Sequence, residues 1–200
     1  MNSFDARARD WDKEKIHLER SVAIAQSLEQ MIPLTQSMKA LEYGAGTGML
    51  SFLLKDKISG ITLMDNSREM ISVCKEKVKS NHAKNLHPLF FDLEHQNYEG
   101  KFDLIYNQMV LHHVHDVNLL LEKFFSLLNP GGYLAIADLF SEDGSFHGEM
   151  ADVHNGFDPQ ELSQLLKEKG FVKTEFRPCF EIERDSKKYP LFLLTAQKRL

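Results

Sequence analysis

Three glycines at alternate positions, Gly44, Gly46 and Gly48, have the spacing that most directly suggests chemistry. They follow the short run Leu41–Tyr43 and precede a helical pattern, which predicts a strand, a glycine turn and the start of a helix. Glycine has no Cβ and accepts positive φ, so a ligand can lie directly against such a turn. The helix would point unpaired N–H groups and a partial positive charge at that ligand. The turn therefore predicts a binding site, although glycine can also serve only the close packing of strand and helix.

An acidic residue, Asp65, ends the next apolar run, which begins at Gly60. It lies at the distance beyond the glycine turn where an acidic residue ends the second strand of a nucleoside-binding fold. A carboxylate accepts two hydrogen bonds, which suits the diol of a ribose. The alternate glycines differ from the G-x-G-x-x-G of dinucleotide enzymes, in which the helix N-terminus faces a pyrophosphate.

The pattern Glu42-x-Gly44-x-Gly46-x-Gly48 resembles the first motif of the class I methyltransferases that use S-adenosylmethionine. In that motif glycines cradle the methionine part of the cofactor, and no phosphate needs to be neutralised. The resemblance covers most of the chain, and four further motifs follow in the family's order: residues 65–70, 91–93, 102–107 and 128–132. Each motif is ordinary alone, but together they predict a methyltransferase.

The resemblance implies a role for each matching residue. Asp65 would hold the ribose hydroxyls, while Asn66 and Met70 would flank the adenine. Asp92 would receive the adenine amino group, and the backbone N–H of Leu93 would meet the ring. These residues and the glycine motif, including Glu42, are the predicted cofactor site.

Asn107 ends the fourth predicted strand, which borders the methyl group in this family, and it completes the predicted cofactor site. In a related branch that methylates exocyclic or amide nitrogens, this strand ends in an Asn/Asp-Pro-Pro-aromatic motif. Here Asn107 is followed by Gln108, Met109 and Val110, so that branch is disfavoured.

Several histidines lie where this family builds its acceptor side. His112 and His113 follow the fourth strand, while His147 and His154 belong to the polar segment 141–156, which reads as a mobile loop over the site. We expect acceptor-facing groups among these four, with His112, His113 and His147 as the candidate catalytic residues. A histidine can act as a base at neutral pH if the acceptor is a hydroxyl or a protonated amine. Histidine is also common at the position of His113 in small-molecule members, so family habit can explain it without catalysis.

The run His112-His113-x-His115 can also be interpreted as a metal cluster. Neighbouring residues on a helix or strand point in different directions, and no cysteine or carboxylate spacing supports a site. We therefore expect no metal.

Composition fits one compact enzyme. The 200 residues are 42 % hydrophobic, enough for one α/β core, and the net charge of −5 disfavours a nucleic-acid partner. A small-molecule acceptor fits better. Cys74 and Cys179 are too few to indicate a disulfide framework, and we expect them to be free thiols. The sequence has neither a membrane-spanning run nor a signal-peptide core, so we expect a cytoplasmic protein with no membrane attachment. No feature of the sequence indicates the oligomeric state.

Helical and strand patterns alternate along the chain, which predicts an α/β fold with a parallel sheet and helices on both faces. The last two runs, 171–180 and 189–198, are joined by a short charged link, which favours an antiparallel hairpin. The family resemblance implies a Rossmann-like, doubly wound, mostly parallel seven-stranded sheet with an antiparallel last strand.

We expect a single methyltransferase domain over residues 1–200, with 1–36 as an N-terminal helical cap and 37–200 as the Rossmann-like core. Residues 4–12 resemble the aromatic and acidic opening that family members fold over the cofactor. Within it, Trp11 could close over the site and exclude water, or simply anchor the helix to the core.

Three interpretations follow. The favoured one is an enzyme that methylates O, N, C or S of a small molecule. An NAD-dependent oxidoreductase is disfavoured by the glycine spacing and by the Asp92 motif, and a non-catalytic S-adenosylmethionine-binding protein is disfavoured by a polar, undamaged acceptor side. No motif names the acceptor, although arsenite would need more thiols than Cys74 and Cys179 offer.

Overall fold

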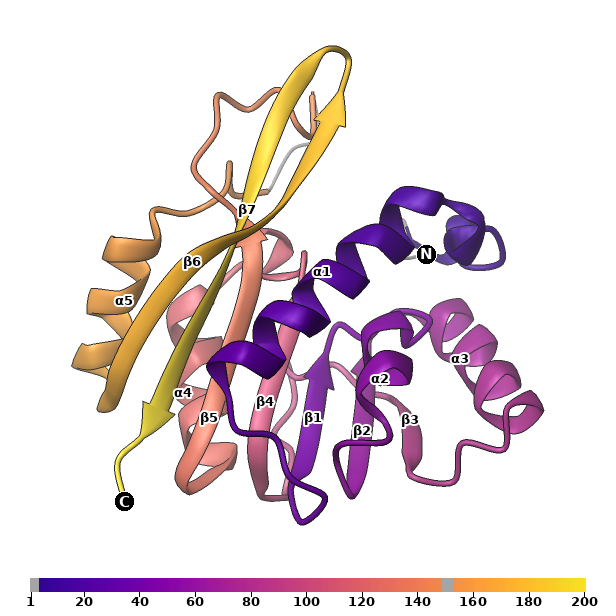
Figure 1. Ribbon diagram of the computed structural model, residues 1–200, viewed down its shortest axis with the longest axis horizontal. Helices are drawn as coiled ribbons and strands as arrows, with labels where there is room; N and C mark the ends of the chain where they lie inside the picture. The colour runs from indigo at the N-terminus through magenta and orange to yellow at the C-terminus, as the bar shows by residue number, and fades with distance from the viewer. Residues whose placement is uncertain (1–3, 149–152) are drawn as a thin grey trace.

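The computed structural model describes residues 4–148 and 153–200. Its centre is a seven-stranded sheet with the strand order β3-β2-β1-β4-β5-β7-β6 (Figure 1). Pairing is parallel from β3 to β5, whereas β7 runs antiparallel to both of its neighbours. The predicted sheet is therefore confirmed. The strands are β1 (Lys39–Tyr43), β2 (Gly60–Asp65), β3 (Leu86–Phe90), β4 (Phe102–Gln108), β5 (Leu128–Leu139), β6 (Phe171–Arg184) and β7 (Lys187–Lys198).

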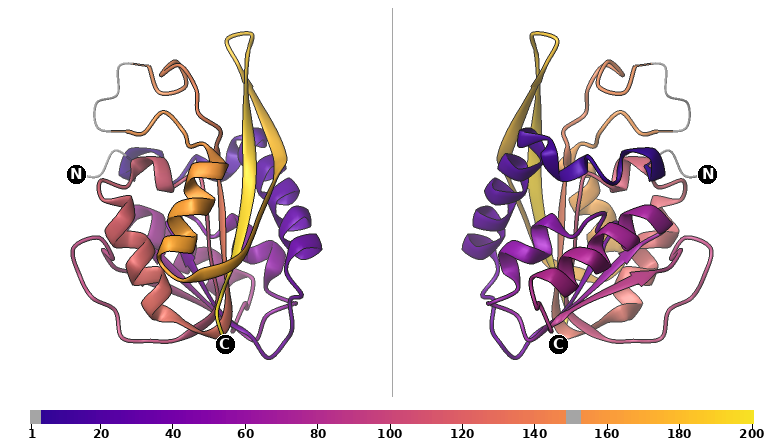
Figure 2. Two further views of the ribbon diagram at one scale, coloured as in Figure 1. Left: turned by 90° about the vertical axis from the view of Figure 1, so that its left-hand side faces the viewer. Right: turned by 90° about the vertical axis from the view of Figure 1, so that its right-hand side faces the viewer.

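Helices cover both faces of the sheet, as a doubly wound fold requires (Figure 2). One apolar cluster joins α1, α2 and α3 to one face, and a second joins α4 and α5 to the other. None of the helices among the described residues is both long and apolar enough to cross a membrane. The helices are α1 (Lys15–Met31), α2 (Met49–Leu54), α3 (Arg68–Ser80), α4 (Val117–Leu127) and α5 (Pro159–Glu168), with 3-10 turns η1 (Asp5–Arg7), η2 (Trp11–Lys13) and η3 (Leu111–His113).

Local sequence explains where three of these helices begin. The side chains of Ser67, Asp116 and Asp158 each accept a hydrogen bond from a backbone N–H in the first turn of α3, α4 and α5. Pro159 occupies the first position of α5, where its fixed φ suits the helix and its missing N–H costs nothing. Asp116 and Asp158 are therefore the N-caps of α4 and α5.

The β6–β7 hairpin is longer than its apolar runs suggest. Most of the charged link continues the two strands, which leaves Asp185 and Ser186 as a two-residue turn. Both turn residues have positive φ, 51° and 62°, as a tight hairpin turn between right-twisted strands requires. Figure 1 shows the hairpin rising beyond the edge where β1 and β5 end.

This edge is the place where the topology predicts a site. The strand order reverses direction between β1 and β4, and ligands of open α/β sheets bind outside the carboxyl ends of the strands at such a point. The first described residues lie beyond the same edge (Figure 1). We call residues 4–36 the N-terminal cap.

Candidate active site

The glycine turn after β1 has the backbone that only glycine adopts easily. Gly44, Gly46 and Gly48 have φ of 66°, 54° and 82°. A Cβ added to Gly44 would lie 2.4 Å from a methyl carbon of Val110, and one added to Gly48 would lie 2.6 Å from Leu63. The turn therefore leaves bare backbone where it meets the ends of the neighbouring strands.

Asp65 connects the glycine turn to the turn between β2 and α3. Its Oδ2 accepts a hydrogen bond from the Gly46 N–H at 2.7 Å, and its Oδ1 accepts one from the Ser67 N–H at 2.7 Å. Burial raises the pKa of Asp65, although both backbone hydrogen bonds oppose that shift. Each carboxylate oxygen has a second lone pair, so Asp65 can still accept hydrogen bonds from a ligand.

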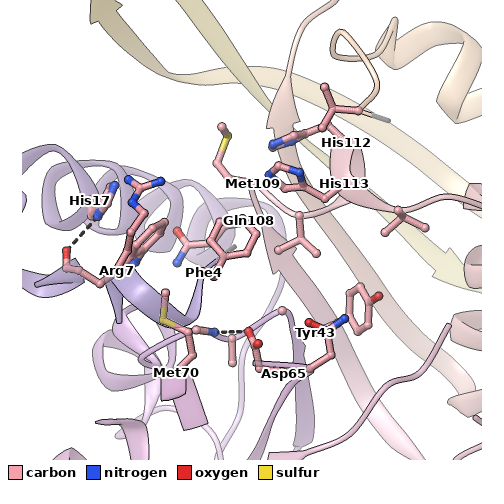
Figure 3. Close-up of a pocket in the computed structure, with 18 of the residues that line it drawn as sticks. Phe4, Arg7, His17, Tyr43, Asp65, Met70, Gln108, Met109, His112 and His113 are labelled. Atoms are coloured by element: carbon pink, nitrogen blue, oxygen red, sulfur yellow. Dashed lines mark hydrogen bonds between the residues drawn. The ribbon is translucent and has the colours of Figure 1, made fainter. Parts of the chain in front are cut away.

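A cavity of about 670 Å³ extends from the glycine turn across the ends of β2 and β4 to the N-terminal cap and the loop after β5 (Figure 3). Its volume is that of a small-molecule site. Ten of the thirteen site residues predicted from the sequence line it: Gly44, Gly46, Asp65, Asn66, Met70, Asp92, Leu93, His112, His113 and His147.

The other three predicted residues, Glu42, Gly48 and Asn107, do not line the cavity. Glu42 is fully buried beneath it and accepts a hydrogen bond from Ser51, and burial raises the pKa of Glu42 to about 8. Gly48 is the N-cap of α2. Asn107 is buried within β4, and its side-chain amide has no hydrogen-bond partner among the described residues. These three residues shape the turn and the sheet below the cavity.

Carboxylates gather at the end of the cavity near the glycine turn. Asp65, Asp92 and Glu94 all line it there. Asp92 Oδ2 lies 2.9 Å from Nδ1 of His95, and its Oδ1 accepts a hydrogen bond from the Glu94 N–H at 3.1 Å. This end of the cavity is therefore acidic and rich in hydrogen-bond acceptors.

Three imidazoles converge at the other end, and we call His112, His113 and His147 the histidine cluster. Their ring centroids lie 4.1 Å (His112–His113), 4.7 Å (His112–His147) and 5.2 Å (His113–His147) apart. The turn η3 supplies His112 and His113, while the loop after β5 brings His147 onto them. The fourth histidine, His154, does not line the cavity, because its Nε2 lies 3.0 Å from the Val114 carbonyl oxygen. The predicted loop 141–156 includes residues 149–152, which lie outside the described residues.

A carboxylate that the sequence analysis missed orients His112. Asp138, buried near the end of β5, accepts a hydrogen bond from Nδ1 of His112 at 2.6 Å. Because an ionised carboxylate only accepts, this hydrogen bond places a proton on Nδ1, so the lone pair of the neutral imidazole is on Nε2. The backbone N–H groups of Leu139 and His112 also donate to Asp138, at 2.8 and 3.3 Å. The signal available in the sequence was the position of Asp138 at the end of an apolar strand.

The other two rings of the cluster are neutral at pH 7. Burial lowers the pKa of His113 to about 3, and repulsion from His112 and His147 adds to this shift. Burial also lowers the pKa of His147. Both rings can therefore accept a hydrogen bond as well as donate one.

The convergence of the cluster corrects one argument from the sequence. Adjacent residues were expected to point apart, yet one nitrogen from each of His112, His113 and His147 lies within 4.8 Å of the others, a set that could hold a metal ion. The guanidinium groups of three arginines, Arg7, Arg20 and Arg184, line the same cavity and would repel a cation. The absence of a metal stays a prediction, and the argument for it is now the positive charge of these arginines.

The N-terminal cap is tied to the turns that line the cavity. Thr47 donates a hydrogen bond to Asp12 at 2.5 Å, and Lys77 of α3 forms an ion pair with the same carboxylate at 2.5 Å. Ser67 donates to Asp5 at 2.6 Å. The cap is thus attached to both turns that surround Asp65.

Both interpretations of Trp11 agree with its position. Trp11 lines the cavity, and its ring also stacks on His17 of α1 with centroids 4.0 Å apart. Next to it, Phe4 packs edge-on against His113 at 5.3 Å, so the cap and the histidine cluster touch. Figure 3 shows Phe4 lying between Asp65 and His113.

A doubly wound sheet with a glycine turn and carboxylates at its switch point defines a nucleoside-binding enzyme fold. Residues 16–175 match the family model of a methyltransferase domain. The chain therefore belongs to the class I S-adenosylmethionine-dependent methyltransferase family. The oxidoreductase interpretation is thereby set aside.

Individual relatives agree with the family. The chain is 35 % identical over 137 residues to malonyl-[acyl-carrier protein] O-methyltransferase 1 of Ilyobacter polytropus, covering 68 % of this chain and 48 % of that one. It is 26 % identical to trans-aconitate 2-methyltransferase of Deinococcus radiodurans, covering 75 % and 57 %. The chain spans about half the length of the curated relatives it matches.

A solved structure shares the fold. Phosphoethanolamine N-methyltransferase 2 of Haemonchus contortus, in complex with S-adenosyl-L-methionine, superposes with a TM-score of 0.75 at 15 % identity, covering 91 % of this chain and 53 % of that one. The cavity described above suits the same cofactor, because one wall is bare glycine backbone and carboxylates line the end beside it.

Proposed function

We propose that this protein transfers the methyl group of S-adenosylmethionine to a small-molecule acceptor bound between the histidine cluster and the N-terminal cap. The observation that carries this proposal is a single cavity that extends from the glycine turn to the histidine cluster. The relative named for trans-aconitate acts on a small molecule by its name, which supports this class of acceptor. We also propose that residues 1–36 act as a cap on a core of residues 37–200.

The cofactor would occupy the acidic end of the cavity. Backbone of Gly44 and Gly46 would cradle its methionine part, and Asp65 would hold the ribose hydroxyls. The adenine would be held by the four remaining cavity-lining members of the predicted set, which are Asn66, Met70, Asp92 and Leu93. Glu42, Gly48 and Asn107 would act from below by fixing the turn and β4.

The sulfonium of the cofactor supplies an activated methyl group. The chain has to hold an acceptor lone pair in line with it, and such alignment contributes several kcal/mol, up to about 7 to 11. The aromatic residues Phe4 and Trp11 on the cap would exclude water from that space.

Where the reacting atom of the acceptor carries a proton, His112 is the proposed base. Its Nε2 lone pair is free because Nδ1 donates to Asp138, and the charge of Asp138 stabilises the imidazolium that forms. His113 and His147 would accept or donate hydrogen bonds to the acceptor as neutral rings.

Calorimetric titration with S-adenosylmethionine, S-adenosylhomocysteine and NAD tests the cofactor half of this proposal. We expect both adenosyl ligands to bind and NAD not to bind. Asp65→Asn should weaken binding roughly 10-fold or more, because a hydrogen bond to a charged group contributes about 1.5–3 kcal/mol. The exposed Asp56 is a matched control, and Asp56→Asn should bind as the wild type does. Equal affinities of the two variants would contradict the role of Asp65.

A further inference from the structure

Arg20 of α1 is a buried charge that has no partner among residues 4–148 and 153–200. Its side chain lines the cavity, yet the residue is only 7 % exposed. The side chain makes no hydrogen bond or ion pair with any residue in the described part of the chain, and its Nε is buried and unpaired. A guanidinium removed from water is expensive unless an anion or several acceptors face it.

Asp138 compensates this charge only at a distance. Its negative charge raises the pKa of Arg20, while burial lowers that pKa to about 10, so Arg20 stays protonated at pH 7. Both oxygens of Asp138 are already engaged by His112, and Leu139 donates to Oδ1 as well. The N–H donors of Arg20 are therefore left for whatever enters the cavity.

Two further arginines line the same cavity. Arg7 lies 4.9 Å from the centre of the Trp11 ring, and Arg184 of β6 donates a hydrogen bond to the Phe146 carbonyl at 2.7 Å. Figure 3 shows Arg7 beside His17 on the side of the N-terminal cap, with Asp65 across the cavity beside Tyr43. The two ends of the cavity thus carry opposite charge, acidic at the glycine turn and cationic at the cap.

We propose that the methyl acceptor carries an anionic oxygen-acid group, a carboxylate or a phosphate, and that the guanidinium of Arg20 binds this group. The inference rests on the proposed function and adds the chemical class of the acceptor. A planar guanidinium matches either anion with paired N–H donors. An ammonium acceptor or a divalent metal would meet the same arginines as like charges.

A fractionation experiment tests the class of acceptor. The protein is incubated with methyl-labelled S-adenosylmethionine and a protein-free metabolite extract that has been separated by anion exchange. We expect label in products of the retained, anionic fraction. Phosphatase treatment of that fraction beforehand distinguishes a phosphate from a carboxylate acceptor, since it removes the phosphate group and spares the carboxylate. Label confined to the unretained fraction would overturn the proposal. If calorimetry detects cofactor binding but no fraction is labelled, the proposed function fails, and this inference fails with it.

Variants of Arg20 test the contact itself. With the labelled fraction as substrate, Arg20→Gln should raise the apparent KM for the acceptor at least 10-fold and leave the Kd of S-adenosylhomocysteine unchanged. The acceptor KM of Arg20→Lys should lie between those of Arg20→Gln and the wild type. The exposed Arg199 provides the control, and Arg199→Gln should behave as the wild type does.

Thermal unfolding separates binding from a structural role. Removing an unpaired buried charge should leave the Tm of Arg20→Gln equal to or above that of the wild type. A lower Tm with an unchanged acceptor KM would mean that Arg20 serves the fold alone, and it would overturn the proposal.

Discussion

At the scale of single residues, Glu42 makes stability depend on pH. Burial raises its pKa in the folded protein from 4.5 to about 8. Between these pH values the native state holds a proton that the unfolded state has released, so this group lowers the free energy of unfolding as pH rises. The stability that Glu42 contributes is fully present below pH 4.5. It falls as the pH rises and is lost at about pH 8.

Glu42→Gln should remove this dependence. We expect the variant to gain stability relative to the wild type between pH 5 and pH 8, by up to a few kcal/mol at roughly 1.4 kcal/mol per pH unit. Denaturant unfolding at the two pH values measures the difference. The exposed Glu161 is the control, and Glu161→Gln should follow the wild type at both. Parallel curves for Glu42→Gln and the wild type would show that Glu42 titrates normally.

Asp138 should matter for turnover more than for binding. Asp138→Asn keeps the side-chain shape but replaces the charge that orients His112 and would stabilise its imidazolium. With an acceptor that must lose a proton, we expect kcat to fall about 100-fold, the lower end of what a positioned base contributes. Single-turnover kinetics and the Kd of S-adenosylmethionine measure the two effects separately. A loss confined to cofactor affinity would contradict the role of His112 as base.

At the scale of elements, the N-terminal cap is attached to the glycine turn by one short hydrogen bond from Thr47 to Asp12. Thr47→Val keeps the side-chain volume and removes the donor. Because a hydrogen bond to a charged group contributes about 1.5–3 kcal/mol, we expect S-adenosylmethionine affinity to fall roughly 10-fold. Thr35, an exposed threonine outside the cavity, supplies the control. Unchanged affinity in Thr47→Val would show that cofactor binding is independent of this contact.

The elements themselves were predictable because their signals are local. Alternating patterns predicted the parallel sheet, and the caps at Asp116 and Asp158 set where α4 and α5 begin. The glycine turn was predictable for the same reason, since positive φ at Gly44 is a property of that residue and its backbone. The ends of the last hairpin were missed because two non-glycine residues, Asp185 and Ser186, make the turn.

The site was only partly predictable, because its acceptor end depends on packing between distant segments. The convergence of His147 with His112 requires the path of the loop after β5, and the exposure of Arg20 to the cavity requires the placement of α1. The direct cofactor contact expected of Glu42 has a geometric difficulty. Successive side chains of a strand alternate, so Leu41 and Tyr43 join the cluster under α4, while Glu42 points to Ser51 of α2.

At the scale of the whole molecule, the cavity is enclosed by segments from both ends of the chain. Trp11 of the cap, the glycine turn, His147 of the loop and Arg184 of the last hairpin all line it. A ligand that binds only the folded state stabilises it by about 2.7 kcal/mol at 100 times its Kd. That stabilisation should therefore reach segments that are far from the glycine turn in sequence.

Hydrogen exchange measures this directly. On adding S-adenosylhomocysteine, we expect slower exchange in residues 4–31 of the cap, as well as in residues 44–48 and 65–70, because Asp5 and Asp12 bind the turns that would hold the cofactor. In Thr47→Val at saturating ligand, the turns should remain protected while the cap loses much of its added protection. Protection limited to the glycine turn in the wild type would mean that the cap does not respond to the cofactor, and the boundary between cap and core would then be only a division of the sequence.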